Sequence, residues 1–105
     1  MSMIRMVALA IALGALTAEA ACAASDDAWE AFRTDVREKC LAAAEPLFAS
    51  ADANVDPFGS EHYGLALISG PAKGAEETTI SAICVYDKAA KTVEIGGELP
   101  AADAD

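Results

Sequence analysis

The chain has 105 residues, with 17 acidic against 7 basic side chains, and its formal net charge at pH 7 is −10. Phosphate backbones and anionic lipid surfaces repel a chain of this charge, so nucleic acid and acidic membranes are excluded as expected partners. Hydrophobic residues make up 54% of the chain, but many of them are alanines, which leaves large apolar side chains for one small core and no second domain.

The first two dozen residues have the pattern of a secretory signal peptide. Arg5 precedes an apolar run over 6–16, and small residues follow over 17–24. The run is shorter than the roughly 20 residues that a membrane-spanning helix needs. We therefore expect segment 1–23 to be removed on export and the mature protein to lie, without a membrane span, in the periplasm or outside the cell, where disulfides form.

The fate of Cys22 depends on the cleavage site. Cleavage after Ala23 removes Cys22 with the signal peptide, which is the expected outcome, whereas cleavage after Ala20 leaves a free thiol near the new N-terminus. A lipid anchor at Cys22 is disfavoured, because lipoprotein processing requires an apolar residue three positions earlier, where this chain has Glu19.

Residues 25–45 are predicted to form an amphipathic helix. Asp27 and Glu30 have the spacing of a capping box at its start. Apolar side chains recur three and four positions apart and form one stripe: Trp29, Phe32, Val36, Cys40 and Ala43. The other side of the helix is charged, and we expect water to solvate it. Pro46 ends this helix or opens one short extra turn.

Strands are predicted in the second half of the chain. Segment 53–58 fits a short edge strand, since Pro57 cannot donate a hydrogen bond to a neighbouring strand. Segment 63–68 alternates in the manner of a strand, and the glycines and proline of segment 70–77 predict a flexible turn.

The clearest strand pattern lies at 78–87. Ile80, Ala82, Cys84 and Tyr86 fall on one side of this strand, and the residues between them fall on the other. A connection of hairpin length leads to a last strand at 92–95. We expect segment 96–105 to be disordered, with its acidic end 100–105 outside the domain.

Cys40 and Cys84 are predicted to form a disulfide, because each lies within a regular element of the mature chain. A bridge closing so long a loop stabilises by about 4 kcal/mol on the chain-entropy model. No C-x-x-C pair or second Cys/His cluster points to redox chemistry, to a metal or to another cofactor. The predicted fold of 24–99 is therefore α+β: one N-terminal amphipathic helix packed on a small antiparallel sheet of three to four strands, joined by one helix-to-strand disulfide.

An acidic loop at 52–61 offers weak candidates for an ion site. Asp52, Asn54 and Asp56 have the spacing that opens an EF-hand calcium loop, and Glu61 and His62 follow. The rest of the loop departs from that pattern, because proline and tyrosine stand where the EF-hand needs glycine and glutamate. A turn in which the Asp and Asn side chains bond their own backbone is the competing interpretation.

Ile83 and Val85 mark a candidate interaction face. If Cys84 points toward the helix, these two side chains point away from it, onto a face that nothing yet covers. Two outcomes are open: the face binds a partner, or the loop over 46–58 folds back and buries it under Phe48 or Phe58.

No set of residues suggests catalysis, so the chain is not expected to be an enzyme. The favoured function is an exported, non-catalytic module that binds another protein, as an accessory subunit or inhibitor, with a homodimer as a further option. The alternative is a small-ligand or metal-ion carrier using the acidic loop 52–61.

Overall fold

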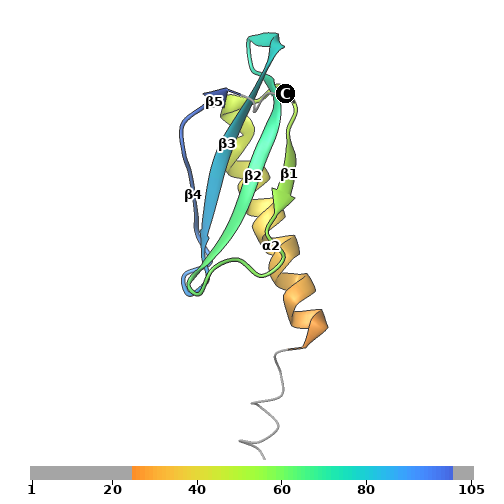
Figure 1. Ribbon diagram of the computed structural model, residues 1–105, viewed down its shortest axis with the longest axis vertical. Coiled ribbons are helices and arrows are strands. Elements are labelled where there is room, and N and C mark those ends of the chain that lie inside the picture. Colours follow the sequence, from red (N-terminus) through yellow and green to blue (C-terminus); the bar gives the residue numbers. More distant parts are fainter. Residues whose placement is uncertain (1–24, 101–105) are drawn as a thin grey trace, which may run out of the picture.

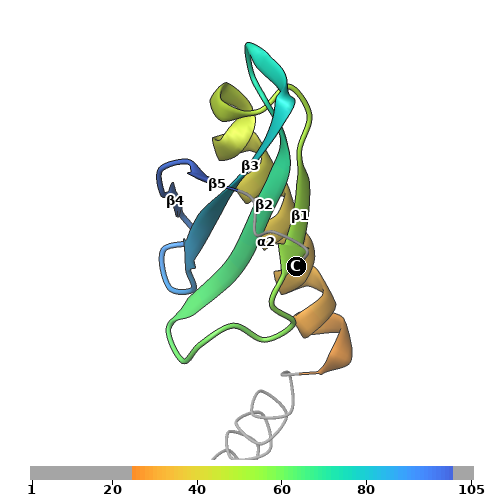
Figure 2. The ribbon, with the colours of Figure 1, turned by 45° about the horizontal axis from the view of Figure 1, so that its top comes forward.

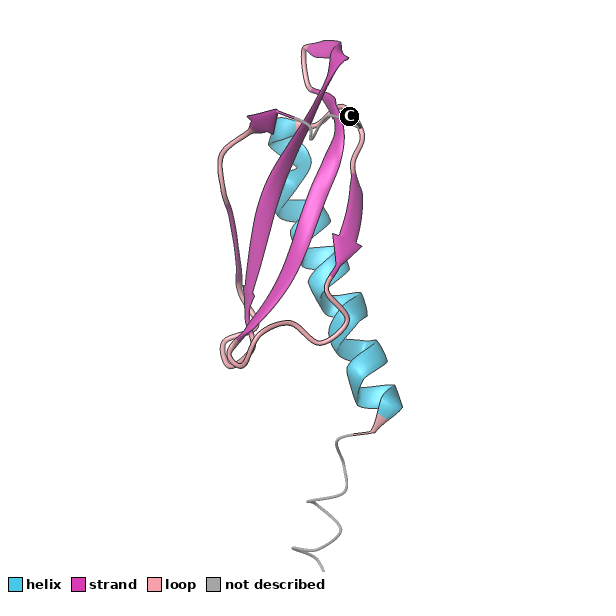
Figure 3. Cartoon of the chain, in the orientation of Figure 1, coloured by secondary structure: helices cyan, strands magenta, loops and turns pink. Residues whose placement is uncertain are grey.

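The computed structural model describes residues 25–100, in which one helix packs across one face of an antiparallel sheet (Figures 1 and 3). The predicted α+β class is therefore confirmed. The predicted signal peptide, Cys22 and the end of the acidic tail lie outside the described residues. Among residues 25–100, no helix is both long and apolar enough to cross a membrane.

Helix α2 runs from Asp26 to Ala44, close to its predicted bounds. Its start differs from the predicted capping box. Ser25 occupies the N-cap position without a side-chain cap bond, so Asp27 already lies in the first turn, where its negative charge favours the positive end of the helix dipole. After α2, Pro46 lies near the start of a short 3-10 helix, η1 (Glu45–Leu47), which is the extra turn that the proline predicted.

The sheet has the strand order β1-β2-β3-β4, and β5 also pairs with β3. Its strands are β1 (Asp52–Val55), β2 (Tyr63–Ala72), β3 (Ala75–Asp87), β4 (Val93–Ile95) and β5 (Leu99–Pro100). All the pairings are antiparallel. The two long strands, β2 and β3, therefore form the centre of the sheet, and the outer strands are short.

Two predicted irregular segments are ordered by pairing. Segment 70–77 was expected to be a flexible turn, but β2 and β3 extend into it and leave only Lys73 and Gly74 between them. Pro71 donates nothing, yet its carbonyl oxygen accepts the amide of Ala49 at 2.9 Å, which holds the strand from its other side. The expected disorder from residue 96 onward is also wrong as far as residue 100, because β5 pairs with β3.

The core lies between α2 and the near side of the sheet. Val36, Cys40 and Ala44 project from the helix and are fully buried, and Ile68, Ala82 and Cys84 are fully buried opposite them. The predicted disulfide is present: it joins Cys40 to Cys84 with a Cα–Cα distance of 5.9 Å. Most core side chains are small, so the bridge reinforces a core that offers little apolar area.

Gly64 lets the helix approach the sheet closely. A Cβ at this position would lie 2.8 Å from Cγ2 of Val36 and 3.0 Å from Cζ of Phe32. Any side chain at position 64 would therefore push α2 away from β2. In both ribbon views α2 lies behind the sheet, which leaves the other face of β2 and β3 without a helix (Figures 1 and 2).

Candidate functional site

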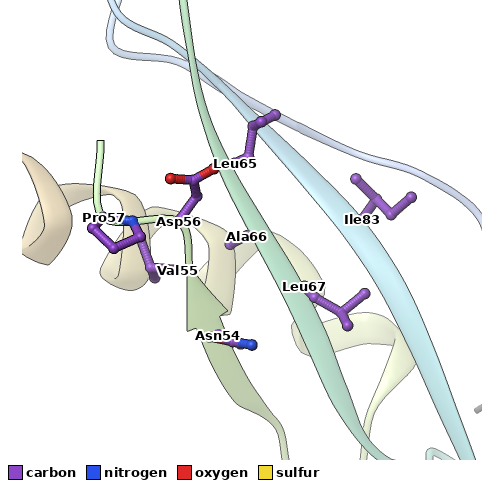
Figure 4. Close-up of a pocket in the computed structure, with 8 residues that line it drawn as sticks. All are labelled: Asn54, Val55, Asp56, Pro57, Leu65, Ala66, Leu67 and Ile83. Atoms are coloured by element: carbon purple, nitrogen blue, oxygen red, sulfur yellow. The ribbon is translucent and has the colours of Figure 1, made fainter. Parts of the chain in front are cut away.

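The sheet face opposite α2, here called the open face, carries an apolar stripe along its two central strands. We define this stripe by two cross-strand pairs, Leu65 with Val85 and Leu67 with Ile83. Leu67 and Ile83 keep 45% and 48% of their surface exposed, although they lie in the middle of the sheet. Figure 4 shows these two side chains projecting side by side from neighbouring strands.

Two further exposed side chains extend the stripe. Tyr63, 45% exposed, precedes Leu65 on the same face of β2. Leu99, 44% exposed, lies opposite Ser81 at the edge formed by β5. The structure thus gathers large apolar side chains of β2, β3 and β5 on one open surface, which is a recognised mark of an interaction site.

Neither aromatic residue of the loop over 46–58 covers this face, so the expectation that the loop buries Ile83 and Val85 is wrong. Phe48 is buried in the core, where its backbone bridges to Ala72. Phe58 packs edge-to-face on the Trp29 ring at the helix side, with the ring centroids 5.0 Å apart. Each phenylalanine therefore finds an apolar neighbour away from the open face.

Basic side chains hold the loop after β1 in this position. Nη1 of Arg33 donates to the carbonyl oxygen of Pro57 at 3.0 Å. Nζ of Lys88 donates to the carbonyl oxygens of Phe58 and Ser60 at 2.9 and 2.7 Å. These bonds tie the loop to α2 and to the turn after β3, so it cannot fold over the stripe without losing them.

An acidic rim flanks the apolar stripe; we define it as Asp52, Asp56 and Glu94. Asp52 starts β1, Asp56 follows that strand, and Glu94 lies in β4 directly opposite Val85. On the β1 side, Asn54 lies opposite Leu67. A shallow hollow of about 410 Å³ lies there, lined by Asn54, Asp56, Pro57, Leu65 and Ile83 among others (Figure 4). The hollow is open to water and joins the stripe to the rim.

The residues proposed for an ion site do not converge. The Asp56 carboxylate accepts the backbone amides of Phe58 and Gly59 at 3.2 and 3.0 Å, which is the self-bonded turn considered for this loop. Glu61 and His62 lie at the surface, with Oε1 and Nε2 3.9 Å apart. No group of three or more His, Cys, Asp or Glu side chains fit to hold a metal occurs among residues 25–100.

A polar network centred on Asp35 lies on the helix side. The Tyr86 hydroxyl donates to the Asp35 carboxylate, which also accepts Nζ of Lys39 at 3.1 Å. Burial and the bond to Asp35 raise the pKa of Tyr86 to about 12. The same bond, with help from Lys39, lowers the pKa of Asp35. With its proton donor and acceptor matched, this network joins α2 to β3 and is structural.

Leu65, Leu67 and Leu99 were not identified as members of the open face from the sequence. A signal was present for two of them: Leu65 and Leu67 alternate with Gly64 and Ala66, and a helix packs closely only on the side that carries the small residues. Leu99 gave no such signal, because its position depends on the pairing of β5 with β3.

This chain matches no protein-family model, no curated protein and no solved structure.

Proposed function

We propose that the chain is an exported, non-catalytic module that binds another protein through the open face of its sheet, as an accessory subunit or inhibitor does. The observation that carries this proposal is the exposure of Leu67 and Ile83 side by side at the centre of the sheet. Burying them under a partner is favourable by about 25 cal/mol for each Å² of apolar surface removed from water.

The face is a better binding surface than the sheet edge at β1. Nη1 of Arg37 donates to the carbonyl oxygen of Ala53 at 2.8 Å, so the helix already occupies part of that edge. An added strand would have to displace this bond before it could pair with β1. Export is supported by the disulfide, since such bonds persist in oxidising compartments.

Photo-crosslinking in the source organism tests the binding surface. A photoreactive amino acid replaces Ile83 in the full chain, and the matched control places it at Glu38, on the outer side of α2. We expect one discrete protein adduct from position 83, reduced when Leu67 is also changed to Thr, and none from position 38. Equal adducts from both positions, or none from position 83, would count against the proposal.

N-terminal sequencing of the natural product tests export separately. We expect the mature chain to begin between Ala21 and Ser25. Recovery of a chain that still begins at Met1 from a cytoplasmic fraction would contradict export.

A further inference from the structure

We infer that the partner bound on the open face presents an amphipathic α-helix, with an apolar side for the stripe and lysine or arginine on both flanks. This inference rests on the proposed function, and it adds the chemistry and shape of the partner. Three features of the structure lead to it. The acidic rim has no paired cations in the described part of the chain, the two parts of the rim are about a helix width apart, and the bond from Arg37 to Ala53 already occupies part of the sheet edge at β1.

The acidic rim has no cationic partners within the described chain. Among residues 25–100, the one Lys or Arg side chain within 4.0 Å of a carboxylate is Lys39, which pairs with Asp35 on the helix side at 3.1 Å. Arg33, Arg37 and Lys88 donate to backbone carbonyls instead. A partner with basic flanks would therefore meet charges that nothing in the domain neutralises.

The same charges argue against a second copy of this chain as the occupant. In a two-fold dimer the identical face is used by both molecules. Two open faces would then bring rim carboxylates of both copies to one interface, on chains whose net charge is −10 each. The rim therefore favours a partner of opposite charge.

The spacing of the rim fits a helix. Asp52 and Glu94 lie on β1 and β4, the outer strands of the order β1-β2-β3-β4, so three strand spacings of about 5 Å separate the two parts of the rim across the strands. Along the strands Asp52 is level with Ser69 and Glu94 is level with Leu65. A helix with its side chains is about 10–12 Å wide and can lie between them along β2 and β3. The other face of the same sheet already accommodates a helix, α2 (Figure 2).

Fluorescence anisotropy with three labelled peptides of about 14 residues tests the inference. The first has leucines at helical spacing with lysines on both flanks of the leucine stripe. The second replaces every lysine by glutamate. The third has the composition of the first but alternates leucine and lysine in strand order. We expect the first peptide to bind about tenfold more tightly than the third, and the second not to bind.

Two pairs of charge reversals separate the rim from overall charge. Asp52→Lys/Glu94→Lys reverses two of the three rim charges, and Glu30→Lys/Glu38→Lys makes the same change in net charge on the outer side of α2. The rim variant should lose about tenfold in affinity for the lysine helix, and the control should change by about twofold at most. Equal losses in both variants, or tighter binding of the strand-ordered or glutamate peptide, would overturn the inference.

Leu67→Thr/Ile83→Thr distinguishes failure of the inference from failure of the proposed function. Both positions are exposed, and threonine retains strand propensity, so the variant should remain folded. If this variant no longer binds the first peptide, the result supports the inference. If position 83 gives a protein adduct but the first peptide does not bind more tightly than the other two, the inference of a basic amphipathic helix is overturned and the open face remains a binding surface. Absence of the adduct would overturn both.

Discussion

Removal of the disulfide between Cys40 and Cys84 should cost the domain a third or more of its free energy of unfolding. The bridge joins the middle of α2 to a central strand across a sequence separation of 44 residues. Closing a loop of that length removes enough unfolded-chain entropy to stabilise by about 4 kcal/mol. A domain of about 75 residues has a net stability of about 4–11 kcal/mol, so the bridge accounts for a third or more of it.

Two perturbations separate the cross-link from the packing of the sulfur atoms. Reduction of the native protein breaks the bond and keeps both sulfurs, whereas Cys40→Ala/Cys84→Ala also removes buried volume between α2 and β3, where both residues are fully buried. We expect the alanine variant to be the less stable of the two, because the void adds to the lost cross-link.

Urea unfolding followed by Trp29 fluorescence measures both effects. Trp29 packs on Phe32 and Phe58, with ring centroids 5.6 and 5.0 Å apart, so its emission reports whether α2 and the loop after β1 remain docked. Without the bridge the denatured chain exposes more surface, and the m-value should rise as stability falls. A loss below about 1 kcal/mol with an unchanged m-value would refute the entropic argument.

Three further predictions concern the two faces of the sheet and their contacts. Val85→Lys should keep the melting temperature within a few degrees, while Ala82→Lys, which places a charge in the core, should unfold the domain; similar effects on thermal unfolding would contradict the assigned faces. Gly64→Ala should cost about 1–3 kcal/mol in urea unfolding, against almost nothing for Gly97→Ala, where no atom lies within 4 Å of an added Cβ. Tyr86→Phe should cost about 1–3 kcal/mol at pH 7, since the bond that it removes ends on a carboxylate. The pKa of Tyr86 is raised from 10.0 to about 12, so the native state keeps this proton longer than the unfolded chain, and the stability that it provides is complete below pH 10 and lost as the pH rises toward 12. The difference in free energy of unfolding between wild type and Tyr86→Phe should therefore narrow from pH 10 to pH 12. A difference that stays constant over this range would contradict the role of the Tyr86 proton.

The elements that the sequence predicted well are those with strong local periodicity. The helical stripe that contains Cys40 and the alternation around Cys84 each span many residues, and the two cysteines then showed which sides of the helix and the strand meet. The same alternation placed Ile83 and Val85 on the far side of the sheet, where the structure has them.

The elements that the sequence missed depend on neighbours distant in the chain. Gly70 and Pro71 suggest a turn, but their strand is held by Ile80 and Thr79 on one side and by Ala49 on the other. Segment 99–100 is a strand only because β3 offers it a free edge. Local propensity carries no information about either contact.

The use of the basic residues links the fold to the proposed partner. Arg33, Arg37 and Lys88 donate to carbonyl oxygens of β1 and the loop after it, so these cations hold backbone in place instead of neutralising carboxylates. Asp52 and Glu94 are therefore left without a paired cation among residues 25–100, and their charge lies beside the apolar stripe. An apolar surface alone would bind many proteins weakly, and carboxylates beside it reject partners of like charge while attracting those with basic flanks. Asp56 also holds the turn after β1, whereas Asp52 and Glu94 make no such bonds within the described chain, so substitutions at these two rim residues should change partner choice without changing stability.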